Sequence, residues 1–205
     1  MDIHINTYKD APWLINDYSI VNLPSITSLN FLKKITKKRN NKNERFVGFG
    51  DPILSNYDSS YYRGIFENID QLKSLESLPE TRDELKNISS ILNNNGDLFL
   101  GDDATETNFK NYNYTNTNLL FFATHGLISG ELKGLNEPGL VFTPPDQVTT
   151  VDDGILTASE ILDFNFPTLD LVVLSACNTS SGTIENPEEL SGLTRSFFYS
   201  GANSI

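Results

Sequence analysis

His125 and Cys177 are the two residues of this sequence best suited to nucleophilic chemistry, and Cys177 is the only cysteine in the chain. A cysteine attacks as its thiolate, and a neighbouring histidine together with local backbone dipoles raises the thiolate fraction. His125 follows the apolar run in "LLFFATHG", and Cys177 ends the run in "LDLVVLSACNT". If both runs are parallel strands of one sheet, both residues emerge at its carboxyl edge, where open α/β sheets place ligands. On that condition the sequence predicts a shared His–Cys site.

Gly126, directly after the histidine, can supply a backbone N–H group for the same chemistry. A residue without Cβ lets a substrate carbonyl come close to its N–H group, and the N–H of Cys177 faces the same region. We therefore expect Gly126 to contact substrate and, with Cys177, to hold an oxyanion. Small residues on both sides of the thiol, in "SACNTSSG", leave room for a peptide strand.

Each of these residues also has a structural interpretation. A lone cysteine at a strand end is more often a small buried hydrophobic residue, and a lone histidine is more often a hydrogen-bonded structural residue than a catalyst. The conjunction favours the chemical interpretation: two strands of parallel type, two reactive residues at the same kind of strand end, and a glycine after the histidine.

The elements that must position these residues alternate between strand and helix. Apolar runs without polar alternation predict central strands covered on both faces, and their alternation with helical spacing predicts an α/β fold. We expect a mostly parallel sheet flanked by helices. The expected strands are 18–23, 45–52, 97–101, 119–126 and 169–177, and the expected helices are 25–38, 79–92, 105–112, 157–162 and 187–199.

A long insertion separates the two strands that carry the chemistry. It contains "GLVFTPP" and "DGILT", which predict a small hairpin leading into a helix, and an insertion of this length is more often functional than filler. Asp153 can in principle receive a basic substrate side chain. Asp51, Asp152 and Asp153 have an equally good role as turn and cap residues, because Asp bonds its own backbone in turns.

Composition limits the class of protein. The net charge of −12 opposes nucleic-acid binding, and the basic cluster in "KKITKKRNNKNER" is interpreted as the solvated end of a helix. A single cysteine excludes an internal disulfide and a cysteine-based structural zinc site, and no apolar run approaches the ~20 residues that span a bilayer. With no signal peptide in "MDIHINTYKDAPWL", we expect a cytoplasmic protein without metal, cofactor, membrane or nucleic-acid partner.

Several strings resemble the CHAT domain family, caspase-like proteins of the cysteine peptidase clan that includes separases. They are "GFGDP", "LPETRDE", "LGDDATE", "ATHG", "GLVFTPP", "DDGILTASEI", "LVVLSACNT" and "GLTRSFFYSGA", within residues 13–205. The resemblance implies a three-layered caspase-hemoglobinase fold with His125 and Cys177 as dyad and Gly126 in the oxyanion position. Their separation, 177 − 125 = 52 residues, is close to the ~50 of caspases. The resemblance also implies a cysteine endopeptidase acting on a protein or peptide.

The resemblance sets expectations for the organisation of the chain. We expect a single domain over residues 1–205, truncated at "GANSI" before a last strand and helix, and normally controlled by tetratricopeptide repeats. One alternative is a catalytically silent interaction module of the same fold. A nucleotide-binding domain using "GFGDP" is weaker, because neither G-x-G-x-x-G nor G-x-x-x-x-G-K-[ST] occurs. A metal hydrolase is weaker still.

Overall fold

A computed structural model describes residues 13, 45–54, 72, 75–93, 95–146, 149, 151–175 and 191–205. The chain divides into two compact units, residues 1–39 and 40–205, and every described residue except Trp13 belongs to the second unit. The expected strand 18–23 and helix 25–38 lie outside the described residues. The single-domain expectation stays a prediction.

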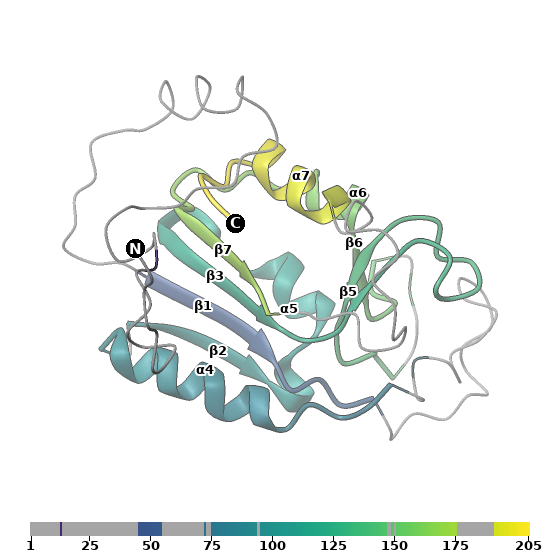
Figure 1. Ribbon diagram of the computed structural model, residues 1–205, viewed down its shortest axis with the longest axis horizontal. Helices are drawn as coiled ribbons and strands as arrows, with labels where there is room; N and C mark the ends of the chain where they lie inside the picture. The colour runs from purple at the N-terminus through teal and green to yellow at the C-terminus, as the bar shows by residue number, and fades with distance from the viewer. Residues whose placement is uncertain are drawn as a thin grey trace, which may run out of the picture. The chain divides into compact units, whose positions relative to one another are not determined.

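A four-stranded sheet forms the centre of the second unit (Figure 1). Its strands lie in the order β2-β1-β3-β7, and each pairs with its neighbour in parallel. This confirms the predicted α/β fold with a mostly parallel sheet. The strands are β1 (Arg45–Gly50), β2 (Gly96–Leu100), β3 (Thr117–Ala123) and β7 (Leu171–Leu174).

Among the described residues, four α-helices and two short 3-10 helices accompany the sheet, and these α-helices overlap the expected ranges. The sequence begins two of them with side-chain caps: the Thr105 side chain accepts a hydrogen bond from the Asn108 N–H, and Thr157 and Glu160 form a capping box. The helices are α4 (Glu80–Ile91), η3 (Gly101–Asp103), α5 (Glu106–Asn111), η4 (Tyr114–Asn116), α6 (Ala158–Ile161) and α7 (Ser191–Tyr199).

Helix α4 covers one face of the sheet through Leu85, which is fully buried against Phe46 and Ala123. Glycine in β1 permits this close approach, because a Cβ on Gly50 would lie 2.6 Å from a methyl carbon of Leu85. The helix therefore packs directly onto the backbone of the central strand.

The opposite face of the sheet is packed mainly with aromatic rings. Phe49 of β1 stacks on Phe122 of β3 with ring centres 5.8 Å apart, and Phe122 lies 5.5 Å from Phe197 of α7. Phe109 of α5 and Ile161 of α6 belong to the same buried cluster. The described elements thus form three layers, with α4 on one side of the sheet and α5, α6 and α7 on the other (Figure 1).

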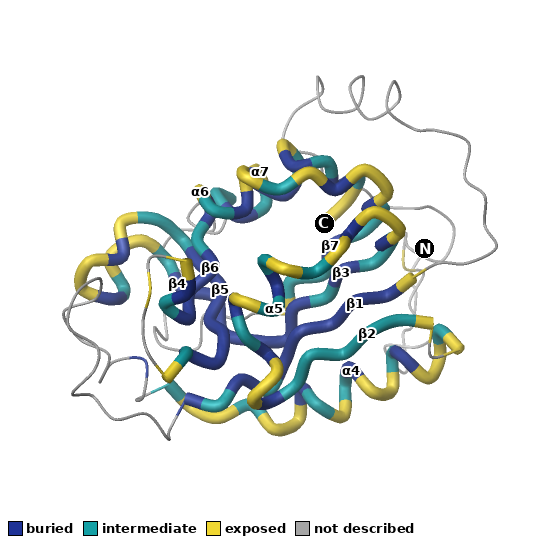
Figure 2. Tube along the Cα trace, turned by 180° about the vertical axis from the view of Figure 1, so that it is seen from behind, coloured by how far each residue is buried: buried dark blue, intermediate teal, exposed yellow. Residues whose placement is uncertain are grey.

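A second, antiparallel sheet of three strands follows the carboxyl end of β3. Strands β5 (Gly139–Val141) and β6 (Ile155–Thr157) form the predicted hairpin, and β4 (Gly126–Leu127) pairs with β5 on the other side. The sequence analysis did not predict β4 as a separate strand. Figure 2 shows how deeply β5 and β6 are buried. Within the described ranges, no helix has both the length and the apolar character to cross a bilayer.

The two faces of α4 make a matched test of this packing. We expect Leu85→Ala to lower the free energy of unfolding by about 2–5 kcal/mol, because it leaves a cavity under β1. Ile91→Ala, on the same helix but 79% exposed, should change it by less than about 0.5 kcal/mol. Urea unfolding monitored by circular dichroism measures both, and equal losses in the two variants would contradict the packing described.

Candidate active site

The strands that lead to His125 and Cys177 are parallel neighbours. The last register pair between β3 and β7 is Phe122 with Leu174, and the Ser175 N–H continues the ladder by donating to the Phe122 carbonyl at 2.8 Å. His125 is three residues after Phe122, and Cys177 is three residues after Leu174. The condition set by the sequence analysis is therefore confirmed for the strands. Cys177 itself lies outside the described residues, so its contact with His125 stays a prediction.

His125 also lies at the point where the strand order reverses. From β1 the chain passes to β2 on one side, and it then returns to form β3 on the other side of β1. The chain therefore leaves the carboxyl ends of β1 and β3 in opposite directions. In doubly wound sheets, ligands bind at this kind of position. Gly50 and Ala123 are the last paired residues there.

The backbone carbonyl of Glu76 fixes the protonation pattern of the imidazole. His125 is only 2% exposed, and its Nε2 lies 2.7 Å from the Glu76 oxygen. A carbonyl oxygen can only accept a hydrogen bond, so Nε2 must carry a proton. The neutral ring is consequently the Nε2–H tautomer, with its lone pair on Nδ1. Glu76 is a contact that the sequence analysis missed.

The backbone around Gly126 turns its N–H away from the neighbouring strand. The Val141 N–H donates to the His125 carbonyl at 2.9 Å, while Gly126 is opposite Leu140 in the register of β4 and β5. In an antiparallel ladder this places Gly126 and Leu140 in a pair that exchanges no hydrogen bonds. The Gly126 N–H therefore points away from β5, and its contact with substrate stays a prediction.

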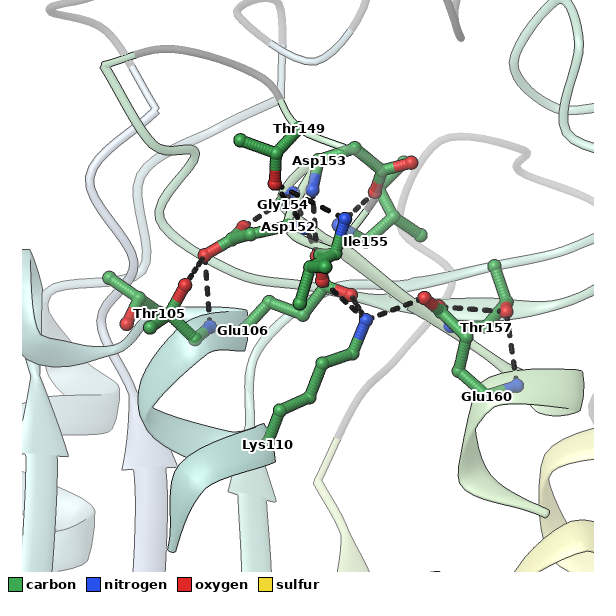
Figure 3. A network of polar contacts seen from close by, with 12 residues as sticks. Thr105, Glu106, Lys110, Thr149, Asp152, Asp153, Gly154, Ile155, Thr157 and Glu160 are labelled. Carbon is green, nitrogen blue, oxygen red and sulfur yellow. Dashed lines mark hydrogen bonds and ion pairs between the residues drawn. The ribbon is translucent and has the colours of Figure 1, made fainter. Parts of the chain in front are cut away.

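A buried polar network ties α5 to the loop that precedes β6 (Figure 3). One carboxylate oxygen of Glu106 accepts hydrogen bonds from the N–H groups of Asp153 at 2.9 Å and Gly154 at 3.1 Å. The other oxygen contacts the Lys110 ammonium group, which also binds Glu160 at 2.6 Å. Helix α5 is thereby fastened to the hairpin and to α6.

One ammonium group serves two carboxyl groups in this network. Burial raises the pKa of Glu106 to about 8, although the hydrogen bond from Lys110 opposes the rise. Burial also acts on Glu160, but there hydrogen bonds from Lys110 and Thr157 outweigh it and lower the pKa. Glu160 therefore carries the charge that balances Lys110 near neutral pH. The spacing of Glu106 and Lys110, i and i+4 on a helix, is the sequence signal that could have revealed the pair.

Asp152 and Asp153 bond the backbone of their own loop, which confirms the turn interpretation for these two residues. Asp152 accepts the Gly154 N–H at 3.2 Å, and Asp153 accepts the Ile155 N–H at 3.0 Å. Burial raises the pKa of Asp153 to about 6. Asp51 forms a 2.6 Å ion pair with Arg82. Within the described part of the chain, no three His, Cys, Asp or Glu side chains gather into a metal-binding group.

Comparison with known families adds to this geometry. A family model of the CHAT domain matches residues 3–205. The chain belongs to the CHAT domain family. No curated protein matches the chain. Membership in this family agrees with the resemblance carried by the strings around His125 and Cys177.

Glu106 should make the stability of this CHAT domain depend on pH. Its pKa is about 8 in the folded chain against an ordinary 4.5, so between these values only the folded state keeps the proton. Its contribution to the free energy of unfolding is therefore present below pH 4.5 and is lost as the pH rises through about 8. We expect the urea midpoint to fall more steeply between about pH 6 and pH 8 in the parent than in Glu106→Gln. Parallel pH profiles would contradict this assignment.

Proposed function

We propose that this CHAT domain is a cysteine endopeptidase that hydrolyses peptide bonds in a protein or peptide through His125 and Cys177. One observation carries the proposal. The imidazole of His125 is held as the Nε2–H tautomer at the end of a strand whose parallel neighbour leads to Cys177. A neutral histidine whose lone pair is on Nδ1 is the kind of base that a thiol needs.

The first half of the proposed reaction is acyl transfer to sulfur. Nδ1 of His125 takes the thiol proton, and the Cys177 thiolate attacks the substrate carbonyl carbon. The carbonyl oxygen becomes an oxyanion, which the N–H groups of Gly126 and Cys177 stabilise. As the C–N bond breaks, Nδ1 returns the proton to the leaving amine, which leaves a thioester on Cys177.

The second half of the reaction hydrolyses the thioester and releases the carboxylic acid product. Water attacks the thioester carbon while Nδ1 of His125 accepts its proton, and the C–S bond then breaks. The proton returns to the departing sulfur, so histidine and thiol are both regenerated. No step requires a cofactor or a metal ion.

The Glu76 carbonyl supports this cycle in the place where many related mechanisms use a carboxylate as the third catalytic group. The 2.7 Å contact orients the ring and fixes Nε2 as the hydrogen-bond donor. Because a backbone oxygen never takes up a proton, it keeps Nε2 protonated throughout.

The second candidate is a catalytically silent interaction module of the same fold. The burial of His125 favours it, because a ring that is 2% exposed and bonded to a carbonyl is also typical of a structural histidine. In either case we propose that tetratricopeptide repeats, associated with CHAT domains, contribute to partner recognition or control.

Alkylation of Cys177 separates the two candidates. Iodoacetamide reports this residue alone, since the chain has a single cysteine. We expect the parent rate to level off at a pH well below the ~8.5 of an ordinary thiol, because His125 stabilises the thiolate. At about pH 6.5, His125→Ala should react on the order of tenfold more slowly.

His4→Ala is the matched control, because it removes the other of the two histidines in the chain. It should retain the parent profile. If the parent, His125→Ala and His4→Ala all follow the curve of an ordinary thiol, Cys177 is not activated and the interaction module is the better account.

A further inference from the structure

The corner between β3 and β4 carries a buried hydroxyl group that the proposed mechanism does not use. We propose that Thr124 is a positioning residue for His125: its side chain fixes the peptide from which the imidazole projects. This inference rests on the proposed function for its catalytic meaning, although the geometry is independent of it.

Both backbone groups of one residue, Val141, hold this corner. The Thr124 hydroxyl donates to the Val141 carbonyl at 2.5 Å, and the Val141 N–H donates to the His125 carbonyl at 2.9 Å. Thr124 and His125 are each 2% exposed. Two consecutive residues are thus clamped to one residue of β5, at the place where the chain leaves the parallel sheet for the antiparallel one.

The clamp matters because the ring has a second fixed point. Nε2 of His125 must stay 2.7 Å from the Glu76 carbonyl, which belongs to the segment before α4. If the peptide between Thr124 and His125 tilts, the ring cannot keep both this contact and the direction of Nδ1. A misplacement of about 1 Å can cost on the order of a hundredfold in rate.

Thr143 provides a control of the same residue type in the same segment. It is also 2% exposed, and its hydroxyl donates to the Gly101 carbonyl at 2.7 Å and accepts from the Ile53 N–H at 2.9 Å. These partners follow β2 and β1, so the bonds of Thr143 do not involve the His125 corner. Loss of its hydroxyl removes two hydrogen bonds, one buried and one partly buried, whereas loss of the Thr124 hydroxyl removes the buried one to Val141.

The experiment compares Thr124→Val, Thr124→Ser and Thr143→Val. Valine keeps the shape without the hydroxyl, and serine keeps the hydroxyl. The first readout is nuclear magnetic resonance of the imidazole nitrogens and of the exchange of the Nε2 proton with water. With two histidines in the chain, His125→Ala assigns the signals. The second readout is the pH profile of iodoacetamide alkylation of Cys177.

In Thr124→Val we expect the His125 Nε2 proton to exchange with water about tenfold faster than in the parent. The plateau rate of Cys177 alkylation should fall about tenfold. Both factors correspond to the loss of one buried hydrogen bond. Thr124→Ser should stay within about twofold of the parent. Thr143→Val should lower the urea midpoint at least as far as Thr124→Val while leaving both His125 readouts unchanged. Should Thr124→Val not fold, Thr124→Ala removes the hydroxyl without adding a branch and takes its place.

Two failures are distinguishable. If the hydroxyl-free Thr124 variant loses stability but keeps the parent proton exchange and alkylation profile, Thr124 has only a structural role and the inference is overturned. If the parent shows no His125-dependent plateau, the peptidase proposal fails. Nε2 proton exchange still decides whether Thr124 positions the ring.

Discussion

Parallel pairing of β3 with β7 is the constraint on which the arrangement of this chain depends. Two strands in register, with Phe122 opposite Leu174, must release their following residues at the same edge of the sheet. The strand order also reverses between β1 and β3, which is the position where doubly wound sheets commonly bind their ligands. The rest of the structure supports this pairing: α4 seals one face through Leu85, and an aromatic cluster seals the other.

The antiparallel sheet gives the edge its finer geometry. Val141 of strand β5 bonds to Thr124 and His125 at the corner. Thr143, two residues after the end of β5, bonds to the segments that follow β1 and β2. The segment 141–143 is therefore bonded to residues that follow three of the four strands, β1, β2 and β3. The network of Glu106 and Lys110 anchors the loop before β6, so the hairpin that carries this segment is held from both sides.

Much of this arrangement could be predicted from the sequence, because continuous apolar runs and helical spacing are strong local signals. They located β1, β2, β3, β7 and α4, and the hairpin followed from its turn residues. Strand β4 was missed because two residues carry no periodicity. The contact of His125 with Glu76 was missed for a different reason: a backbone carbonyl 49 positions away leaves no mark on side-chain chemistry. This contact arises from the way the folded chain brings the two segments together, not from the types of the two residues.

The central claim is that His125 and Cys177 share one site, and a disulfide tests it most directly. In His125→Cys the chain has two cysteines. If the two positions share one site, their Cα atoms lie within the ~4.4–6.8 Å that a disulfide needs. The account predicts that mild oxidation of the folded variant removes both free thiols and lowers the mass by two hydrogens. If the variant folds and both thiols remain free while the protein stays monomeric, the two strand ends do not meet as described.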